Sequence, residues 1–485
     1  MRGSWLLGGL IAASALLAVG ERQAEACGGC FQQPPPPPPS PRPPSVVTDH
    51  RMIVAISQGQ TTLYDELRYN GSPESFAWVL PISGTAKIGV SSDGVFSTLD
   101  AMTQITVIPP PENCPAYPTG CSSSFGDNAA PASNAGAGGG VTVTAQQTVG
   151  PYETVQLHSN DGASLNQWLT SHGYVVPDDI KPVVDQYVSE HFDFLALKLV
   201  PGQGIQAMRP VRVTTTGASA VLPLRMVAAG TGAKVGIVLW MVAEGRYEPQ
   251  NFPFFQIKAD ELEWDWTTYS SNLATLRTEK EAKLDGRGWE HESSVAFPVS
   301  DMSNYLRNGY CQPYYGGYNG GGYNGGGAPS SVGSARACSG AQNDYEAEDG
   351  GAGNPGRSKQ QVQEEDLTTL LAGIPGKVRI TRVRASLAHA SLDRDLVLQA
   401  SADQAELSPA RQVTREKNQP ICAVYQGCDN IGTAPRDQAI ARSGGSAESF
   451  SCATTGRKTG NTLLTIAGFV ALAMVAAKRL RKNKK

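Results

Sequence analysis

Residues 235–243 read VGIVLWMVA, an apolar run between Lys234 and Glu244. Such a run is apolar on both faces of a strand and too short to span a bilayer, so it predicts a strand at the centre of a sheet. The glycine-rich stretch 230–236 resembles a phosphate loop, but it joins two expected strands and opens no helix, so we expect a hairpin turn there. Three more runs with strand character precede it, at 192–200, 208–214 and 221–228.

The flanking sequence adds shorter strands and a few helices. Residues 51–57 and 61–69 alternate in polarity and predict a β-hairpin, and the strand expected at 76–82 carries Pro81, which favours an edge strand or the end of a strand. This order predicts an α+β fold, in which an antiparallel, sheet-rich ectodomain carries a few packed helices. Helices are expected at 93–102, 165–173, 180–188, 272–284 and after the capping box of Ser358 and Gln361, and strands at 152–158, 377–384 and 396–399.

The N-terminus is typical of an exported protein. Arg2 precedes an apolar region of 14 residues at 6–19, and Ala-Glu-Ala at 24–26 matches a signal-peptidase site. Cleavage there leaves Cys27 first, so lipidation of this cysteine is the alternative; an Ala stands three residues before it, however, where lipoprotein signals usually carry Leu. We therefore expect residues 1–26 to be a signal peptide removed by ordinary cleavage.

The C-terminus predicts a membrane anchor. Residues 462–477 form an apolar stretch of 16 residues, just below the roughly 17–25 that span a membrane. Lys478 can extend its charge to the interface, and the basic tail 478–485 should stay cytoplasmic. We expect a transmembrane helix at 462–477, which makes the membrane a partner and places the bulk of the chain outside the cytoplasm, in the cell envelope.

The charge balance excludes a protein that holds nucleic acid by bulk charge. The chain has 40 Lys and Arg against 44 Asp and Glu, a net charge of -4. The two ends hold eight of the basic and two of the acidic residues, so the exported part has 32 against 42. This acidic exterior also argues against docking on anionic lipid headgroups.

Nine cysteines in an exported chain predict disulfide bonds. Cys452 is left over, because the other eight fall into near-neighbour pairs, and local pairing is the simplest arrangement even though spacing does not fix connectivity. The C-x-x-C that begins at Cys27 leads into polyproline and not into a helix, so a structural disulfide is favoured there over a redox or metal site. The eight are Cys27 and Cys30, Cys114 and Cys121, Cys311 and Cys338, and Cys422 and Cys428.

Composition divides the chain between the signal and the anchor into segments. In the insertion at 309–357, YNGGG occurs twice, and such a tract buries too little to order itself, so we expect a disordered loop. Residues 109–140 form a Pro-, Ser-, Ala- and Gly-rich excursion. The remaining segments are a Cys- and Pro-rich spacer (27–45), the main ectodomain (46–308), its C-terminal part (358–403) and a Cys-containing linker (404–461).

The six histidines form no recognisable catalytic pattern, and the sequence predicts no cofactor and no metal. His172 precedes Gly173 at a helix end, where a C-terminal cap explains it. Two polar clusters keep a weak metal or acid–base alternative to simple solvation: Glu190, His191 and Asp193, and Glu290, His291 and Glu292.

Two charged stretches also have plain explanations. Residues 344–349 alternate like a calcium loop, but Pro355 stands where a bidentate Glu is required, which leaves only weak calcium binding as an alternative. The basic residues of 377–384 alternate and are expected on the solvent face of a strand, with an anion-binding patch as the alternative: Lys377, Arg379, Arg382 and Arg384.

Several segments together are similar to those of one bacterial family: LYDELRYNG (63–71), FAWVLPI (76–82), NQWLTSHGYVVP (166–177), FDFLALKLVPG (192–202), LPLRM (222–226) and VGIVLWMVAEGRYEP (235–249), with Ala-Cys-Gly-Gly at 26–29. They resemble the domain-of-unknown-function family 2330, over roughly residues 26–400. The resemblance implies an exported protein and supplies no catalytic residues.

The tail resembles a second known pattern. Ser451 and Cys452 precede Gly456 and Arg457, and an apolar helix and a basic cluster follow. This order resembles the myxobacterial C-terminal sorting signal. The resemblance implies that Cys452 is the processing and anchoring residue and that a sorting protease is a partner.

We therefore expect a cell-envelope protein that acts by binding or as a structural component, and we lean against an enzyme. The alternative is an exported hydrolase whose site is assembled from residues distant in sequence, such as His191 or His291 with carboxylates.

Overall fold

The computed structural model describes residues 46–70, 77–117, 147–174, 176, 178, 180–200, 207–229, 231–311, 338, 339, 345, 347 and 356–443. The expected signal peptide, the C-x-x-C, the apolar segment 462–477, the basic tail, Cys121 and Cys452 lie outside these residues. In the described part of the chain, no helix is long and apolar enough to cross a membrane.

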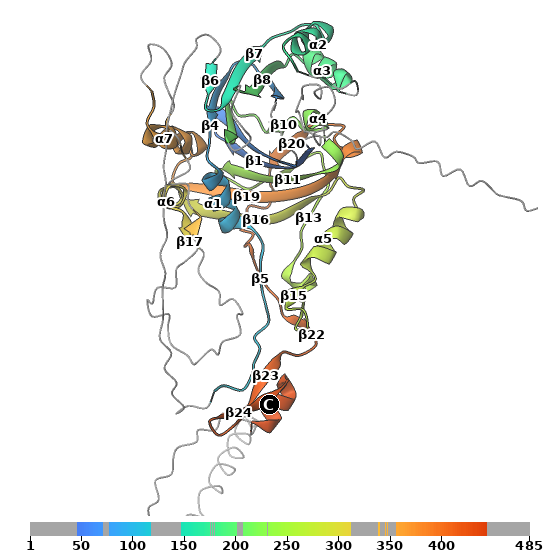
Figure 1. The fold of residues 1–485 in the computed structure, drawn as a ribbon, viewed down its shortest axis with the longest axis vertical. Coiled ribbons are helices and arrows are strands. Elements are labelled where there is room, and N and C mark those ends of the chain that lie inside the picture. Colours follow the sequence, from blue (N-terminus) through green and yellow to red (C-terminus); the bar gives the residue numbers. More distant parts are fainter. Residues whose placement is uncertain are drawn as a thin grey trace, which may run out of the picture.

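An eight-stranded sheet forms the centre of the molecule, in the order β13-β16-β19-β11-β1-β2-β9-β4 (Figure 1). β11 lies between β19 and β1, and its Leu239, Trp240 and Met241 are fully buried, so the prediction of a central strand is confirmed. β1 and β2 form the predicted antiparallel hairpin. The strands are β1 (Val46–Ile56), β2 (Gln60–Asn70), β4 (Ala86–Val90), β9 (Val211–Thr216), β11 (Thr231–Ala243), β13 (Phe254–Phe255), β16 (Trp289–Pro298) and β19 (Lys377–Ala388).

Two expectations before β11 are wrong. Residues 221–228 contain only the short strand β10 (Val221–Leu222), followed by the helix α4 (Leu224–Val227). Pro223 ends the strand, because it has no N–H to donate to a neighbour. No hairpin turn therefore joins two long strands at 230–236, and β11 instead pairs in parallel with β1.

A four-stranded antiparallel sheet packs against one end of the large sheet, in the order β3-β8-β7-β6. β3 is its edge strand, as Pro81 predicts. Trp78 and Leu80 of β3 share a core with Ile88 of β4 and Val211 of β9. The strands are β3 (Ala77–Ile82), β6 (Gln147–Val149), β7 (Tyr152–Leu157) and β8 (Asp193–Leu199).

Helices cover both faces of the large sheet. One face carries Ile53 and Trp240 and packs against α1 (Asp93–Thr103), α6 (Val299–Asn308) and α7 (Lys359–Leu370). The other face packs against α2 (Gly162–Ser171), α3 (Lys181–Ser189) and α4. The predicted helices are present, including the capping box of Ser358 and Gln361 at the start of α7.

The insertion at 309–357 is not entirely separate from the core. Tyr345 is 4% exposed, and its hydroxyl donates to the buried carboxylate of Asp366 at 2.9 Å. Asp366 also accepts hydrogen bonds from Ser91 and Arg212. The expected loop is therefore attached to α7 at one described point. Within it, β17 (Tyr310–Cys311) and β18 (Cys338–Ser339) form a short antiparallel strand pair.

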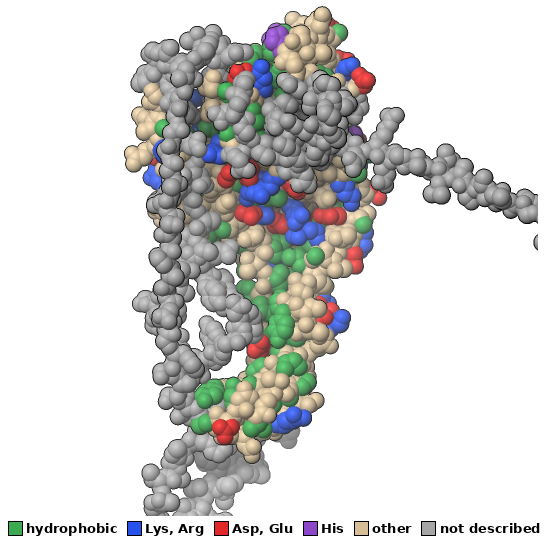
Figure 2. All heavy atoms as spheres, in the orientation of Figure 1, with side chains coloured by type: hydrophobic (Ala, Val, Ile, Leu, Met, Phe, Trp, Pro, Cys, Tyr) green, Lys and Arg blue, Asp and Glu red, His purple; other side chains and the backbone are tan. Residues whose placement is uncertain are grey.

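Residues expected to be a linker, 404–461, are folded over much of their length. They contain β21 (Ala410–Gln412), β22 (Arg415–Lys417), and a hairpin of β23 (Ile421–Gln426) and β24 (Asp429–Pro435) packed with α8 (Arg436–Arg442). We call residues 421–442 the C-terminal module. Figure 1 shows it at the end of an extension that leaves the sheets, and Figure 2 shows hydrophobic side chains along this extension. In this extension, β21 pairs with β5 (Thr106–Ile108). β14 (Glu263–Asp265) pairs with both β15 (Ser270–Ser271) and β22, near α5 (Leu273–Ala282). Beside the large sheet, β12 (Tyr247–Pro249) pairs with β20 (Leu396–Ala400).

The local disulfide pairing is wrong for two of the expected pairs. Cys114 is bonded to Cys422, across a sequence separation of 308. Because Cys422 is bonded to Cys114, it is not the partner of Cys428, which is also disulfide-bonded. The reason is topological: β5 pairs in parallel with β21, which brings the chain after β5 to the C-terminal module. Cys311 and Cys338 are register partners in the β17–β18 pair.

Candidate functional site

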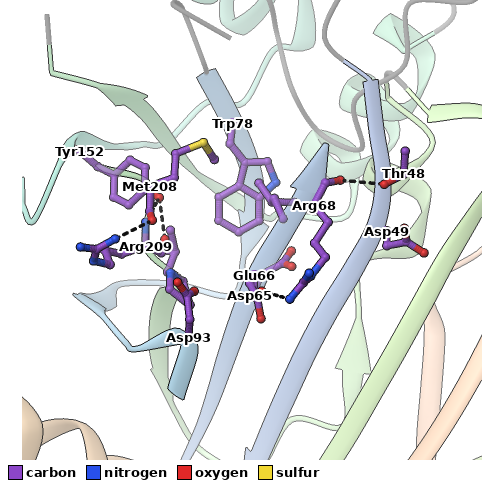
Figure 3. Close-up of a pocket in the computed structure, with 13 residues that line it drawn as sticks. Thr48, Asp49, Asp65, Glu66, Arg68, Trp78, Asp93, Tyr152, Met208 and Arg209 are labelled. Carbon is purple, nitrogen blue, oxygen red and sulfur yellow. Dashed lines mark hydrogen bonds and ion pairs between the residues drawn. The ribbon is translucent and has the colours of Figure 1, made fainter. Parts of the chain in front are cut away.

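A cleft of about 530 Å³ opens where the large sheet meets the four-stranded sheet (Figure 3). β9 pairs with β2 only as far as Asp65, which lies opposite Val211. Within the described residues, no strand adjoins 66–70 on that side. The cleft therefore receives side chains from both faces of β2, and we call it the β2 cleft.

Two buried carboxylates form the inner wall of the β2 cleft. Asp65 is 3% exposed and accepts a hydrogen bond from Nδ1 of His50, which lies 3.0 Å from Oδ2. Glu66 pairs with Arg51 at 2.8 Å and with Arg68 at 3.0 Å. Burial raises the pKa of Glu66, and the two guanidiniums oppose this rise. The fold thus holds each inner carboxylate with a donor of its own.

Aromatic rings complete the wall. Trp78 is 3% exposed and lies between Met208 and Arg68 (Figure 3). The Tyr152 hydroxyl donates to the Arg209 carbonyl at 2.6 Å and accepts from its N–H at 2.9 Å. Tyr152 therefore fixes the segment that leads into β9. The cleft combines flat apolar surface with fixed hydrogen-bond acceptors, an arrangement suited to binding a small molecule.

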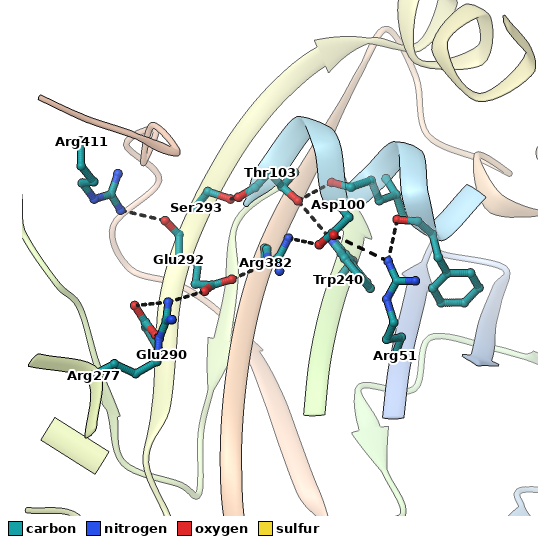
Figure 4. Close-up of polar contacts among 12 residues, drawn as sticks. Arg51, Asp100, Thr103, Trp240, Arg277, Glu290, Glu292, Ser293, Arg382 and Arg411 are labelled. Atoms are coloured by element: carbon teal, nitrogen blue, oxygen red, sulfur yellow. Dashed lines mark hydrogen bonds and ion pairs between the residues drawn. The ribbon is translucent and has the colours of Figure 1, made fainter. Parts of the chain in front are cut away.

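Glu66 also begins a ladder of alternating carboxylates and guanidiniums. Figure 4 shows the ladder from Arg51 onwards, beneath α1. The ladder crosses the large sheet from β2 to β16, where Arg277 of α5 joins Glu292 to Glu290. Its members fix neighbouring elements to one another, since a buried charge is stable only beside its partner. In order they are Glu66, Arg51, Asp100, Arg382, Glu292, Arg277 and Glu290.

Trp240 of β11 lies between two guanidiniums of the ladder, those of Arg51 and Arg382. Its ring lies 5.4 Å from the Arg51 guanidinium carbon and 5.2 Å from that of Arg382. Its Nε1–H donates to the Thr103 hydroxyl at 2.9 Å. Arg382 is only 7% exposed, because α1 covers this face of the sheet. The prediction that the basic residues of 377–384 lie on a solvent face is therefore wrong for Arg382.

The cluster Glu190, His191 and Asp193 does not converge on one site. Glu190 forms an ion pair with Arg225 at 2.6 Å, and Asp193 accepts from His158 at 2.5 Å. His191 is exposed, with a positive φ of 63°. His172 is the C-cap of α2, as predicted, and its Nδ1 donates to the Trp168 carbonyl.

The second cluster is buried and structural. His291 is 1% exposed; its Nδ1 accepts from Arg246 at 3.2 Å and its Nε2 donates to the Tyr247 carbonyl at 3.3 Å. Burial, and secondarily the Arg246 charge, lower the pKa of His291 to about 4. Glu290 and Glu292 belong to the ladder. Neither His191 nor His291 lines the β2 cleft.

The residues of the β2 cleft were not predicted as a site. One signal was present in the sequence: Asp65 lies between Leu63 and Leu67 on the alternating face of β2 that packs inward, and an acid in that position is buried. Trp78 and Tyr152 gave no signal, because both look like ordinary core residues. In the described residues no group of His, Cys, Asp and Glu is placed to hold a metal ion, and the acidic residues of the calcium-like stretch lie outside them.

Comparison with known proteins gives a family and no activity. No curated protein and no solved structure matches the chain. A family model described as an uncharacterised protein conserved in bacteria, domain of unknown function 2330, matches residues 24–297. The match covers more than half of the chain and all the strands that line the β2 cleft, so the chain belongs to this family.

Proposed function

We propose that the protein is an exported cell-envelope protein whose ectodomain binds a small molecule in the β2 cleft. The observation that carries the proposal is the cleft itself: about 530 Å³, with two aromatic rings and two buried carboxylates held by their own partners. This volume lies in the usual range of small-molecule sites, roughly 300–1,000 Å³. Because Asp65 and Glu66 are held before a ligand arrives, binding costs little ordering.

The location follows from the two ends of the sequence. The signal peptide at 1–26 directs export, and the apolar segment 462–477 holds the chain in the membrane unless processing at Cys452 transfers it to the surface. Peptide-mapping mass spectrometry of the native, unreduced protein tests this. A mature N-terminus at Cys27 supports export, and an intact Met1 would contradict it. A C-terminus near Cys452 with added mass supports sorting, and an intact Lys485 supports a single-pass anchor.

Binding in the cleft is tested with a filled variant. Met208 lines the cleft and is half-buried, so Met208→Trp should occupy the cleft and Met208→Leu should leave it open. The full chain is screened against a library of small polar and charged compounds by thermal shift. Compounds that stabilise the wild type and Met208→Leu but not Met208→Trp support the proposal. Equal stabilisation of all three, or none by any compound, contradicts it.

A further inference from the structure

We propose that the β2 cleft binds an organic ammonium ion that also carries a hydrogen-bond-accepting oxygen. This inference rests on the proposed function, because it names the class of ligand for the same cleft. Three observations carry it: the charge of the wall, its aromatic rings and one N–H donor that faces the cleft without an acceptor.

The charge of the wall favours a cation. Four lining side chains are carboxylates and two are guanidiniums. Arg68 is paired with Glu66, and Arg209 keeps its charge while it donates to the Met208 carbonyl at 3.2 Å, so the carboxylates of the lining still outnumber its guanidiniums by two. Asp49 is exposed, and its carboxylate has no hydrogen-bond or ion-pair partner among the residues that the structure describes. A cation that enters the cleft therefore meets negative charge that the protein has not neutralised.

The aromatic rings suit the same ligand. Trp78 and Tyr152 are 3% and 1% exposed, so their rings are withdrawn from bulk solvent while they line the cleft. A cation near the face of an indole is attracted by the ring quadrupole, and the attraction grows where water is excluded. The Asp65 carboxylate next to them accepts only from His50 among the described residues, so it can accept from an ammonium as well.

The indole N–H of Trp78 supplies the second part of the recognition. No acceptor in the described part of the chain takes this N–H, and its nitrogen is not among the buried atoms that lack a partner, although the residue as a whole is 3% exposed. Figure 3 shows the nitrogen on the side of the ring where Arg68 lies, inside the cleft. The N–H is therefore open to the cleft, and an oxygen on the ligand can accept a hydrogen bond from it.

The test uses probes of equal length that differ in one group. Binding of 5-aminopentanol, 1,5-pentanediol, 5-hydroxypentanoate and pentylamine to the full chain is measured by calorimetry. We expect 5-aminopentanol to bind at least about tenfold more tightly than the diol or the carboxylate, since only it carries the cation. A lysine derivative blocked at both backbone ends is added, because an alkyl ammonium can come from a free amine or from a peptide. Tighter binding of the blocked lysine identifies the peptide as the source, and tighter binding of 5-aminopentanol identifies the free amine.

Three variants assign the interactions. Trp78→Phe keeps an aromatic ring but removes the N–H, so it should weaken 5-aminopentanol about fivefold more than it weakens pentylamine, which has no oxygen to accept from the indole. Asp49→Asn should weaken both amines about threefold, and this difference should shrink at high salt. Asp260→Asn is the matched control, because Asp260 is exposed and lies outside the cleft.

The outcomes separate this inference from the proposed function. If the diol or the carboxylate binds as tightly as the amine and Trp78→Phe weakens it, the cleft is a binding site but the ammonium inference is wrong. If amines bind and neither cleft variant differs from Asp260→Asn, they bind elsewhere and the inference fails. If no probe binds, the inference also fails, and the library screen with the Met208 variants decides the proposed function independently.

Discussion

His291 is a buried imidazole whose surroundings favour its neutral form. Its pKa is about 4 in the folded protein and about 6.5 in the unfolded chain. Between these values the unfolded chain binds a proton that the folded protein does not, so the free energy of unfolding falls as the pH drops from about 6.5 to 4 and levels off below. The loss should reach up to about 3 kcal/mol.

Denaturant unfolding at pH 7, 5.5 and 4 measures this effect. His291→Gln should flatten this part of the pH dependence, because Gln does not titrate there. His191→Asn is the control, since His191 is exposed and Asn tolerates its positive φ. A wild-type slope that persists in His291→Gln would assign the titration to another group.

Arg382 joins two carboxylates of the ladder, so its loss should be costly. Arg382→Met leaves Glu292, which is 3% exposed, with one guanidinium fewer, and removes a cation from Trp240. Breaking a buried ion pair from one side costs about 3–5 kcal/mol, and the remaining Arg277 should hold the loss to about 3.

Chemical denaturation measures the free energy of unfolding of Arg382→Met and of a control variant, Arg307→Met. Arg307 pairs with Glu364, but their side chains are 44% and 61% exposed, so this loss should stay below about 1 kcal/mol. Equal losses in the two variants would mean that the ladder contributes no more than a surface pair.

At the scale of elements, the C-terminal module depends on a covalent bond more than on packing. Its core holds only a few buried residues, and Cys422 is one of them. Closing so long a loop with the Cys114–Cys422 bond is worth on the order of 5 kcal/mol of chain entropy. The bond therefore secures an element that would otherwise separate from the extension.

Cys114→Ser should loosen this module and leave the sheets intact. We expect proteolysis between about residues 410 and 443 to accelerate at least tenfold, because local opening becomes easier while the large sheet keeps its contacts. Mass spectrometry of the fragments locates the cuts, and Ser408→Ala serves as a control on a neighbouring exposed residue. Cuts in β1 or β11 at the same rate would show that the bond supports the whole fold.

At the scale of the whole molecule, stability should decrease from the centre of the large sheet outwards. β1, β11 and β19 lie side by side with both faces covered, whereas the C-terminal module is attached by short strand pairs and the disulfide. We predict that amide hydrogen exchange is slowest in these three strands and fastest in β23 and β24. Hydrogen exchange with mass spectrometry on the full chain checks the order, and protection of β23 equal to that of β11 would contradict it.

Much of the architecture could be predicted because it depends on local patterns. The apolar run at 235–243 specified a central strand, alternation specified the β1–β2 hairpin, and Pro81 specified an edge. The capping box of Ser358 and Gln361 marked the start of α7. In each case a property of adjacent residues, such as polarity alternation or a missing N–H, fixes the local backbone wherever the segment lies.

The sequence by itself determined the family, the α+β class and most elements, whereas the site depended on pairings between distant segments. Asp65 and Trp78 line the same cleft only because β2 extends beyond the end of its pairing with β9 and the four-stranded sheet packs beside that extension. Arg382 is buried only because α1 covers it, and Cys114 finds Cys422 only through the β5–β21 pairing. Local propensity carries no information on which distant partner a segment meets, because that choice is made by the burial of apolar surface and the pairing of charges in the assembled fold.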